Sequence, residues 1–216
     1  LPQGGERVAL DPADFSTTID NPYWPMAPGT RWVYRETTGD GPPNRVVVTV
    51  TDRTKRVAAG IVGRVVHDRV TRAGRLVEDT LDWYAQDAAG NVWYLGEATR
   101  EYERGRVSST AGSWEAGVDG AQAGVVVPAH PRVGMTYRQE HRPGEAEDRA
   151  RVLALDERVQ VPAGSFRRAL MTRDWTPLEP DVVEHKLYAR GTGPVLTLDV
   201  SGGSGREELL RITRRG

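Results

Sequence analysis

The sequence contains no cysteine among its 216 residues. Disulfide bonds, thiolate zinc sites and cysteine nucleophiles are therefore excluded. An excess of either charge is also lacking, because 29 lysines and arginines stand against 30 aspartates and glutamates. A general nucleic-acid-binding protein needs a basic surplus on one face, and a membrane-surface protein of the polybasic kind needs a cationic segment. Neither class fits, and no nucleic-acid partner is expected.

Lysine is scarce, since Lys55 and Lys186 are the only two and all other basic residues except histidine are arginine. This bias fits a GC-rich coding sequence or, alternatively, a network of surface ion pairs. No apolar run approaches the roughly 18 residues that cross a bilayer, so no transmembrane segment is expected. The chain starts at Leu1 with a polar, tether-like stretch. Such a start is typical of a processed exported protein, secreted or held at the cell envelope, although a trimmed cytoplasmic protein would look the same.

Turn-forming residues are plentiful, with 24 glycines and 14 prolines. They suit many short strands better than a few long helices. Apolar residues recur with period two in segments such as 45–51, and signals such as Asp87-Ala88-Ala89-Gly90 predict hairpins between them. The pattern predicts an all-β fold, an antiparallel meander of roughly ten strands that forms a barrel-like or strongly curled sheet with little helix.

The predicted domain organisation is simple. Residues 1–21 are irregular and weakly periodic, and we expect them to form a flexible N-terminal arm. Residues 22–216 are expected to form a single antiparallel β domain, monomeric or weakly oligomeric. Within it, residues 109–127 are rich in glycine and alanine and predict a long loop that covers an opening of the sheet.

Three segments are familiar as a set, namely 25–34 (PMAPGTRWVY), 161–166 (VPAGSF) and 188–195 (YARGTGPV). In this order they resemble a broad group of exported bacterial proteins and lipoproteins of unknown function. Segment 82–94 (DWYAQDAAGNVWY) is similar to a narrower, uncharacterised subset of that group. The resemblance implies a secreted, curled antiparallel sheet of the kind compared with lipocalins and lipoprotein carriers. It implies no catalytic residues, and Pro194 departs from the apolar strand usual at that point.

Charged residues inside the predicted strands, next to tryptophans, are the candidates for chemistry. Alternation places Glu78, Thr80, Asp82 and Tyr84 on one face of their strand, and Trp93, Leu95 and Glu97 on one face of the next. If such residues point inward, they form a ligand pocket. Its predicted ligand-binding residues are Trp83, Trp93, Trp114 and Trp175 as apolar walls, with Arg138, Glu140 and His185 as polar anchors.

Several functions remain open at this point. The leading hypothesis is an exported protein that binds a small or amphipathic ligand inside the curled sheet. The second is a cation-dependent or acid/base enzyme that uses strand carboxylates and His185, with calcium as the possible ion and Asp82, Glu97 and Glu140 as its ligands. A third is an envelope scaffold without a small ligand, in which the charged residues face solvent and form surface ion pairs.

Overall fold

The computed structural model describes residues 1–39 and 41–215. Within these residues sixteen strands join one antiparallel sheet, and the expected all-β, curled or barrel-like fold is confirmed. The strands, in chain order, are β1 (Phe15–Ser16), β2 (Arg31–Thr37), β3 (Asn44–Arg56), β4 (Val62–Arg72), β5 (Arg75–Asp87), β6 (Val92–Glu103), β7 (Arg106–Ser109), β8 (Trp114–Glu115), β9 (Gln122–Val127), β10 (Thr136–Arg138), β11 (Glu140–His141), β12 (Arg149–Val161), β13 (Gly164–Trp175), β14 (Val183–Ala189), β15 (Gly193–Ser201) and β16 (Arg206–Thr213).

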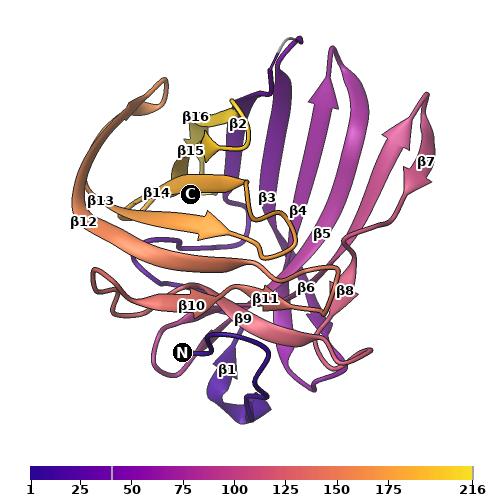
Figure 1. Ribbon diagram of the computed structural model, residues 1–216, viewed down its shortest axis with the longest axis vertical. Helices are drawn as coiled ribbons and strands as arrows, with labels where there is room; N and C mark the ends of the chain where they lie inside the picture. The colour runs from indigo at the N-terminus through magenta and orange to yellow at the C-terminus, as the bar shows by residue number, and fades with distance from the viewer. Residues whose placement is uncertain (40, 216) are drawn as a thin grey trace.

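The order of strands in the sheet explains why it is nearly closed. It runs β10-β12-β13-β14-β15-β16-β2-β3-β4-β5-β6-β9-β11. The two outermost strands, β10 and β11, are consecutive in the chain with only Gln139 between them. The sheet therefore curls until its ends meet, with β9, β10 and β11 together at the end near the N-terminus (Figure 1). The hairpin ends of β4–β5 and β6–β7 extend away from this seam.

The first residues of the chain lie against the sheet. A 3₁₀ turn, η1 (Pro12–Asp14), leads into β1, which pairs with β5. The guanidinium of Arg138 donates to the carbonyl oxygens of Gly4 and Glu6, and also to that of Ala123 in β9. Arg138 is 1% exposed, so these carbonyls supply the acceptors that a buried charge requires. The division into a flexible arm and a β domain stays a prediction.

The segment 109–127 contributes the strands β8 and β9 to the sheet, so the prediction of one long covering loop is wrong. Both β8 and β9 pair with β6. The strand β9 carries a run of buried apolar residues, Ala123 to Val127. Because its glycine and alanine content lowers strand propensity, the pairing reflects tertiary context, which outweighs local preference in sheets. The predicted hairpin at 87–90 is present, since Asp87 and Asn91 pair across it.

Period-two alternation decides which side chains face the inside of the curl. On β3, Val46 and Val48 point inward and pack beside Tyr34 and Trp32 of β2, their partners in register. On β5, Glu78 and Asp82 share the inward face with Tyr84, as predicted. Strong alternation of this kind follows directly from strand geometry, in which successive Cβ atoms point to opposite faces.

A β-bulge interrupts the alternation of β6. Trp83 of β5 pairs with Gly96, whereas the next residue, Tyr84, pairs with Tyr94. The extra residue, Leu95, leaves Tyr94 and Glu97 on the same inward face although they are three positions apart. The prediction that Trp93, Leu95 and Glu97 share a face is therefore wrong. Gly96 makes the bulge possible with a φ of 132°, a conformation that other residues rarely adopt.

The bulge generates a stability prediction. A Cβ atom at Gly96 would overlap the carbonyl oxygen of Trp114 in β8, and the positive φ would add backbone strain. We expect Gly96→Ala to lower the free energy of unfolding by roughly 2–4 kcal/mol, measured by urea denaturation. The matched control is Gly41→Ala, where a Cβ meets no atom within 4 Å. Equal stability of the two variants would contradict the structural role of the bulge.

Candidate functional site

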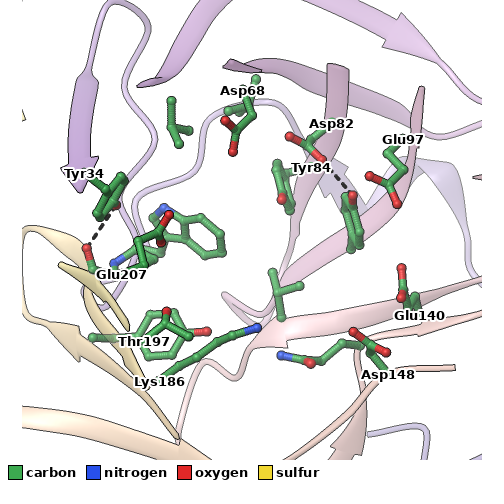
Figure 2. Close-up of a pocket in the computed structure, with 18 residues that line it drawn as sticks. Tyr34, Asp68, Asp82, Tyr84, Glu97, Glu140, Asp148, Lys186, Thr197 and Glu207 are labelled. Atoms are coloured by element: carbon green, nitrogen blue, oxygen red, sulfur yellow. Dashed lines mark hydrogen bonds between the residues drawn. The ribbon is translucent and has the colours of Figure 1, made fainter. Parts of the chain in front are cut away.

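The interior of the curled sheet contains a cavity of about 340 Å³. Its walls come from most of the strands, and its lining combines aromatic rings, carboxylates and a few aliphatic side chains (Figure 2). The lining residues are Trp24, Tyr34, Val48, Val66, Asp68, Asp82, Tyr84, Tyr94, Glu97, Val126, Gln139, Glu140, Asp148, Lys186, Tyr188, Pro194, Thr197 and Glu207.

Five aromatic rings form a continuous series beside the cavity, here called the aromatic arc: Tyr188, Trp24, Tyr84, Tyr94 and Trp114. Tyr84 and Tyr94 are stacked, with ring centroids 4.9 Å apart and planes at 17°. Trp24 lies 5.5 Å from Tyr84 and 6.0 Å from Tyr188. Trp114 meets Tyr94 edge-on at 5.3 Å. The arc gives the cavity a wall of π faces and edges, which bind apolar groups and cations alike.

Six carboxylates among the described residues line the same cavity, here called the carboxylate set: Asp68, Asp82, Glu97, Glu140, Asp148 and Glu207. They come from six places in the chain, so the curl of the sheet, and no local motif, brings them together. Asp82 is 8% exposed and accepts a hydrogen bond of 2.7 Å from the hydroxyl of Tyr94.

Burial changes the acidity of this set. It raises the pKa of Asp82 to about 7, although the Tyr94 hydroxyl opposes the shift. Burial, with the nearby charge of Asp82, raises the pKa of Glu97 to about 8. Burial and Glu36 raise the pKa of Glu207 to about 7. These carboxyl groups therefore exchange protons close to neutral pH, which is unusual for acidic side chains.

The pKa values of the remaining carboxyl groups of the set are raised as well. Burial raises the pKa of Glu140, and the proximity of Asp148 and Glu97 adds to the effect. The pKa of Asp148 is also raised by burial, with Lys186 acting against the shift. Burial raises the pKa of Asp68 well above its ordinary value. The buried Oδ1 atom of Asp68 has no hydrogen-bond partner within residues 1–39 and 41–215, and its side chain points into the cavity (Figure 2).

Lys186 is the single basic side chain among the described lining residues. Its Nζ atom lies 3.4 Å from Oδ2 of Asp174 and 3.1 Å from Oε2 of Glu184. Burial favours the neutral amine, but Asp174 and Glu184 outweigh it and raise the pKa of Lys186 well above its ordinary value. Asp174, 4% exposed, also accepts from Gln139 and Thr172. The ammonium is thus already paired with two carboxylates outside the carboxylate set.

A second hollow, of about 450 Å³, adjoins the cavity and shares Asp68 and Glu207 with it. Three more carboxylates, Glu36, Glu78 and Glu101, line this hollow together with Arg72. The Nε of Arg72 donates to Asn44 at 2.8 Å. Acidic groups therefore continue from the cavity toward the hairpin tips of β4–β5 and β6–β7.

Four of the residues predicted from the sequence come together here. Asp82, Glu97 and Glu140 line the cavity, and Trp114 is buried against Tyr94 at the end of the aromatic arc. Their assignment to a ligand or a metal ion stays a prediction. Among the described residues, however, no three histidine, aspartate or glutamate side chains are grouped so that they could hold a metal ion. The structure gives the predicted calcium site no support.

The other predicted ligand-binding residues lie away from the cavity. Trp83 is on the opposite face of β5 from Asp82, with the Nζ of Lys55 3.9 Å from its ring centre. Trp93 donates to Asp87 at 2.8 Å and packs against Phe15. Trp175 stacks with Arg173 on the outer face of β13. Trp83 and Trp93 are buried in the hydrophobic core and Trp175 is half-buried, so these three tryptophans stabilise the sheet away from the cavity.

Arg138 and His185 complete the residues that the structure places elsewhere. The donors of Arg138 are engaged by backbone carbonyls of the first residues and of β9. His185 pairs in register with Arg173 and Leu198, on the face of β14 opposite Lys186. Neither is among the residues that line the cavity.

Sequence reasoning missed Lys186 and most of the tyrosines. Alternation on β14 separates Lys186 and Tyr188 from His185 and Leu187, and the sequence offered two choices of inward face. The prediction of His185 as a polar anchor implies that the face carrying His185 and Leu187 points inward, whereas the face carrying Lys186 and Tyr188 lines the cavity. The rarity of lysine in this chain was the available signal for Lys186. Tyr84 was detectable too, because it shares its predicted face with Asp82.

Comparison with known proteins shows what the chain resembles. No protein-family model and no curated protein sequence matches it. A candidate exported protein with a YmcC-like fold from Bacteroides fragilis is 17% identical, with a TM-score of 0.52 over 88% of this chain and 98% of that one. A candidate lipoprotein from Parabacteroides distasonis is 12% identical, with a TM-score of 0.48 over 88% and 98% of the two chains.

A β-barrel-like protein of a domain of unknown function (DUF1849) from Brucella abortus is also 12% identical, with a TM-score of 0.48 over 87% and 98%. The resemblance expected from the sequence, to exported proteins and lipoproteins with a curled antiparallel sheet, is confirmed at the level of the fold. At 17% identity the likeness shows the fold alone. In the part of the chain that the structure describes, no helix has the length and apolar character to cross a bilayer.

The acidity of the cavity generates a prediction about stability and pH. Burial raises the pKa of Asp82 in the folded state above its ordinary value of 3.8, to about 7. The unfolded chain therefore loses this proton first as pH rises, so stability falls between about pH 4 and pH 7. We expect Asp82→Asn to remove part of this decline and to stabilise the protein at pH 8 by on the order of 2 kcal/mol, with little effect at pH 4.

Thermal unfolding at pH 4, 6 and 8 measures this effect. Asp79→Asn is the matched control, because Asp79 is on the outer face of the same strand and pairs with His67 and Arg69. If Asp82→Asn and the unsubstituted protein change stability in parallel from pH 4 to pH 8, the buried carboxyl group does not exchange its proton as described.

Proposed function

We propose that this chain is an exported binding protein that holds a small ligand in the cavity of its curled sheet. The observation that carries the proposal is the convergence of polar groups on an internal space of about 340 Å³. Ligand pockets combine apolar and aromatic walls with a few polar groups that fix orientation. The aromatic arc and the carboxylate set correspond to these two components.

Two further observations support the proposal. An interior built only for stability would be filled with apolar side chains, because buried carboxyl groups cost free energy. The fold supports export indirectly, since the Bacteroides fragilis protein of similar fold is described as a candidate exported protein. Binding at the cell envelope or outside the cell is therefore the function proposed, and an envelope scaffold without a ligand is less well supported.

An acid/base enzyme is the second candidate function. Asp82 and Glu97 face each other across β5 and β6, and their pKa values of about 7 and about 8 suit general acid and base catalysis near neutral pH. His185, the base expected from the sequence, lies on the other face of the sheet. A bound compound recovered with altered mass after incubation would favour the enzyme, and recovery unchanged would favour the binding protein.

A cavity-filling substitution tests the binding proposal. Val48 lines the cavity and is only partly buried, so we expect the larger ring of Val48→Phe to occupy ligand space without overpacking the core. The probes are octylamine, 1-octanol and octanoate, measured by isothermal titration calorimetry. We expect at least one to bind, and Val48→Phe to weaken that binding by about tenfold, or 1.4 kcal/mol.

The matched control is Val133→Phe, because Val133 is 66% exposed and is not among the residues that line the cavity. Binding that is equally weakened by both substitutions, or that is unaffected by either, would contradict a ligand site inside the sheet.

A further inference from the structure

The chemistry of the cavity lining identifies a class of ligand, an inference that rests on the proposed binding function. The carboxylate set contributes six acidic groups, and Lys186 is the single basic group beside them among the described lining residues. The ammonium of Lys186 already lies within 3.4 Å of Asp174 and 3.1 Å of Glu184. Its one charge is therefore shared with two carboxylates outside the set and does not balance the six acidic groups. Charge balance inside the cavity is left to protons or to a bound cation.

The acceptor capacity of the set is also incompletely used. A carboxylate offers about four acceptor positions, and the Tyr94 hydroxyl fills one position of Asp82. The buried Oδ1 of Asp68 has no partner within residues 1–39 and 41–215. Both side chains point toward the cavity from adjacent strands, as Figure 2 shows. A group that donates several hydrogen bonds and carries positive charge satisfies such acceptors, whereas an anion or an acyl chain does not.

The aromatic arc defines the other half of the ligand. Tyr84 and Tyr94 stack within 4.9 Å of each other and Trp24 continues the series, so an apolar group finds a broad aromatic wall beside the carboxyl groups. Aromatic faces also attract ammonium groups, and carboxylates beside aromatic rings are a recurring means of binding alkylated amines. A small inorganic cation would make no use of this wall.

We propose that the ligand is an organic cation, an amine or quaternary ammonium with an apolar body. Its charged group would lie among Asp82, Glu97 and Glu140, and its apolar body against Trp24, Tyr84 and Tyr94. The acidic hollow toward the hairpin tips, with Glu36, Glu78 and Glu101, favours the entry of cations because charge of one sign concentrates ions of the opposite sign.

Binding of such a cation is coupled to loss of protons from the carboxylate set. Raised pKa values of about 7 for Asp82 and about 8 for Glu97 mean that both are largely protonated at pH 6, and a bound ammonium favours their ionised forms. The titratable and charged groups that face this position are Tyr34, Asp68, Glu78, Asp82, Tyr84, Tyr94, Glu97, Glu140, Asp148, Asp174, Glu184, Lys186, Tyr188 and Glu207.

Calorimetry with the same three eight-carbon probes tests the proposal, because they differ mainly in head-group charge. At pH 8 we expect octylamine to bind at least about tenfold more tightly than 1-octanol and octanoate. An alkylamine stays protonated across this range, with a pKa of about 10. Between pH 6 and pH 8 its affinity should rise by about tenfold, as a carboxyl group of pKa near 7 ionises.

Substitutions in the carboxylate set test whether these carboxyl groups are responsible for the binding of octylamine. The double variant Asp82→Asn/Glu97→Gln should lose octylamine binding by at least about tenfold while leaving 1-octanol binding within about twofold. The control Asp79→Asn, on the outer face of β5, should bind octylamine like the unsubstituted protein. Retention of thermal stability by the double variant shows that a loss of binding is not a loss of folding.

The outcomes separate the two proposals. If all three probes bind equally and Val48→Phe weakens all of them, the cavity binds ligands but the preference for cations is refuted. If none binds, both proposals fail. If calcium chloride binds and octylamine does not, the site takes a metal ion and the inference is overturned. Octylamine affinity that is unchanged from pH 6 to pH 8 would contradict the coupling to protons.

Discussion

The convergence of six carboxyl groups on one cavity, with Asp82 buried and the other five half-buried, is the constraint on which the rest of the structure depends. Ionisable groups cannot be packed like aliphatic ones, because each requires solvent, a proton or a partner. The inside of the sheet is accordingly hollow where these groups converge. Close packing is found beside the cavity, around residues such as Trp32 and Leu209, which are fully buried. The residues that line the cavity and the residues that form the close-packed core thus lie in different parts of one interior.

Much of the fold could be predicted because strand geometry is local. A period of two places Asp82 and Tyr84 on one face whatever the rest of the chain does. The hairpin between β5 and β6 is encoded by Asp87 and Gly90, which suit a tight turn. The curled antiparallel sheet follows from many such strands with short connections. For the candidate site, this reasoning found Asp82, Glu97 and Glu140 in the cavity lining.

The other site residues could not be predicted, because their positions depend on features that the alternation of strand residues does not encode. A single bulge at Leu95 and Gly96 reverses the faces of β6, and no residue pattern announces it strongly. On β14 both faces are partly apolar, so the choice between His185 and Lys186 required knowledge of which side is hollow. The assumption that the inward face is the more apolar one fails when the interior is a polar cavity. The same assumption misplaces Trp83 and Trp175, and the bulge on β6 separates Trp93 from Glu97.

The seam between β10 and β11 has a mechanical consequence. These two strands end the sheet on either side, and Gln139 alone separates them. Beside it, Arg138 holds carbonyl groups of β9 and of the first residues. Widening the barrel here would leave the buried guanidinium of Arg138 without hydrogen-bond acceptors, which costs on the order of several kcal/mol in proteins. The seam is therefore a costly place at which to open the barrel, whereas the hairpin ends of β4–β5 and β6–β7 lie away from it (Figure 1).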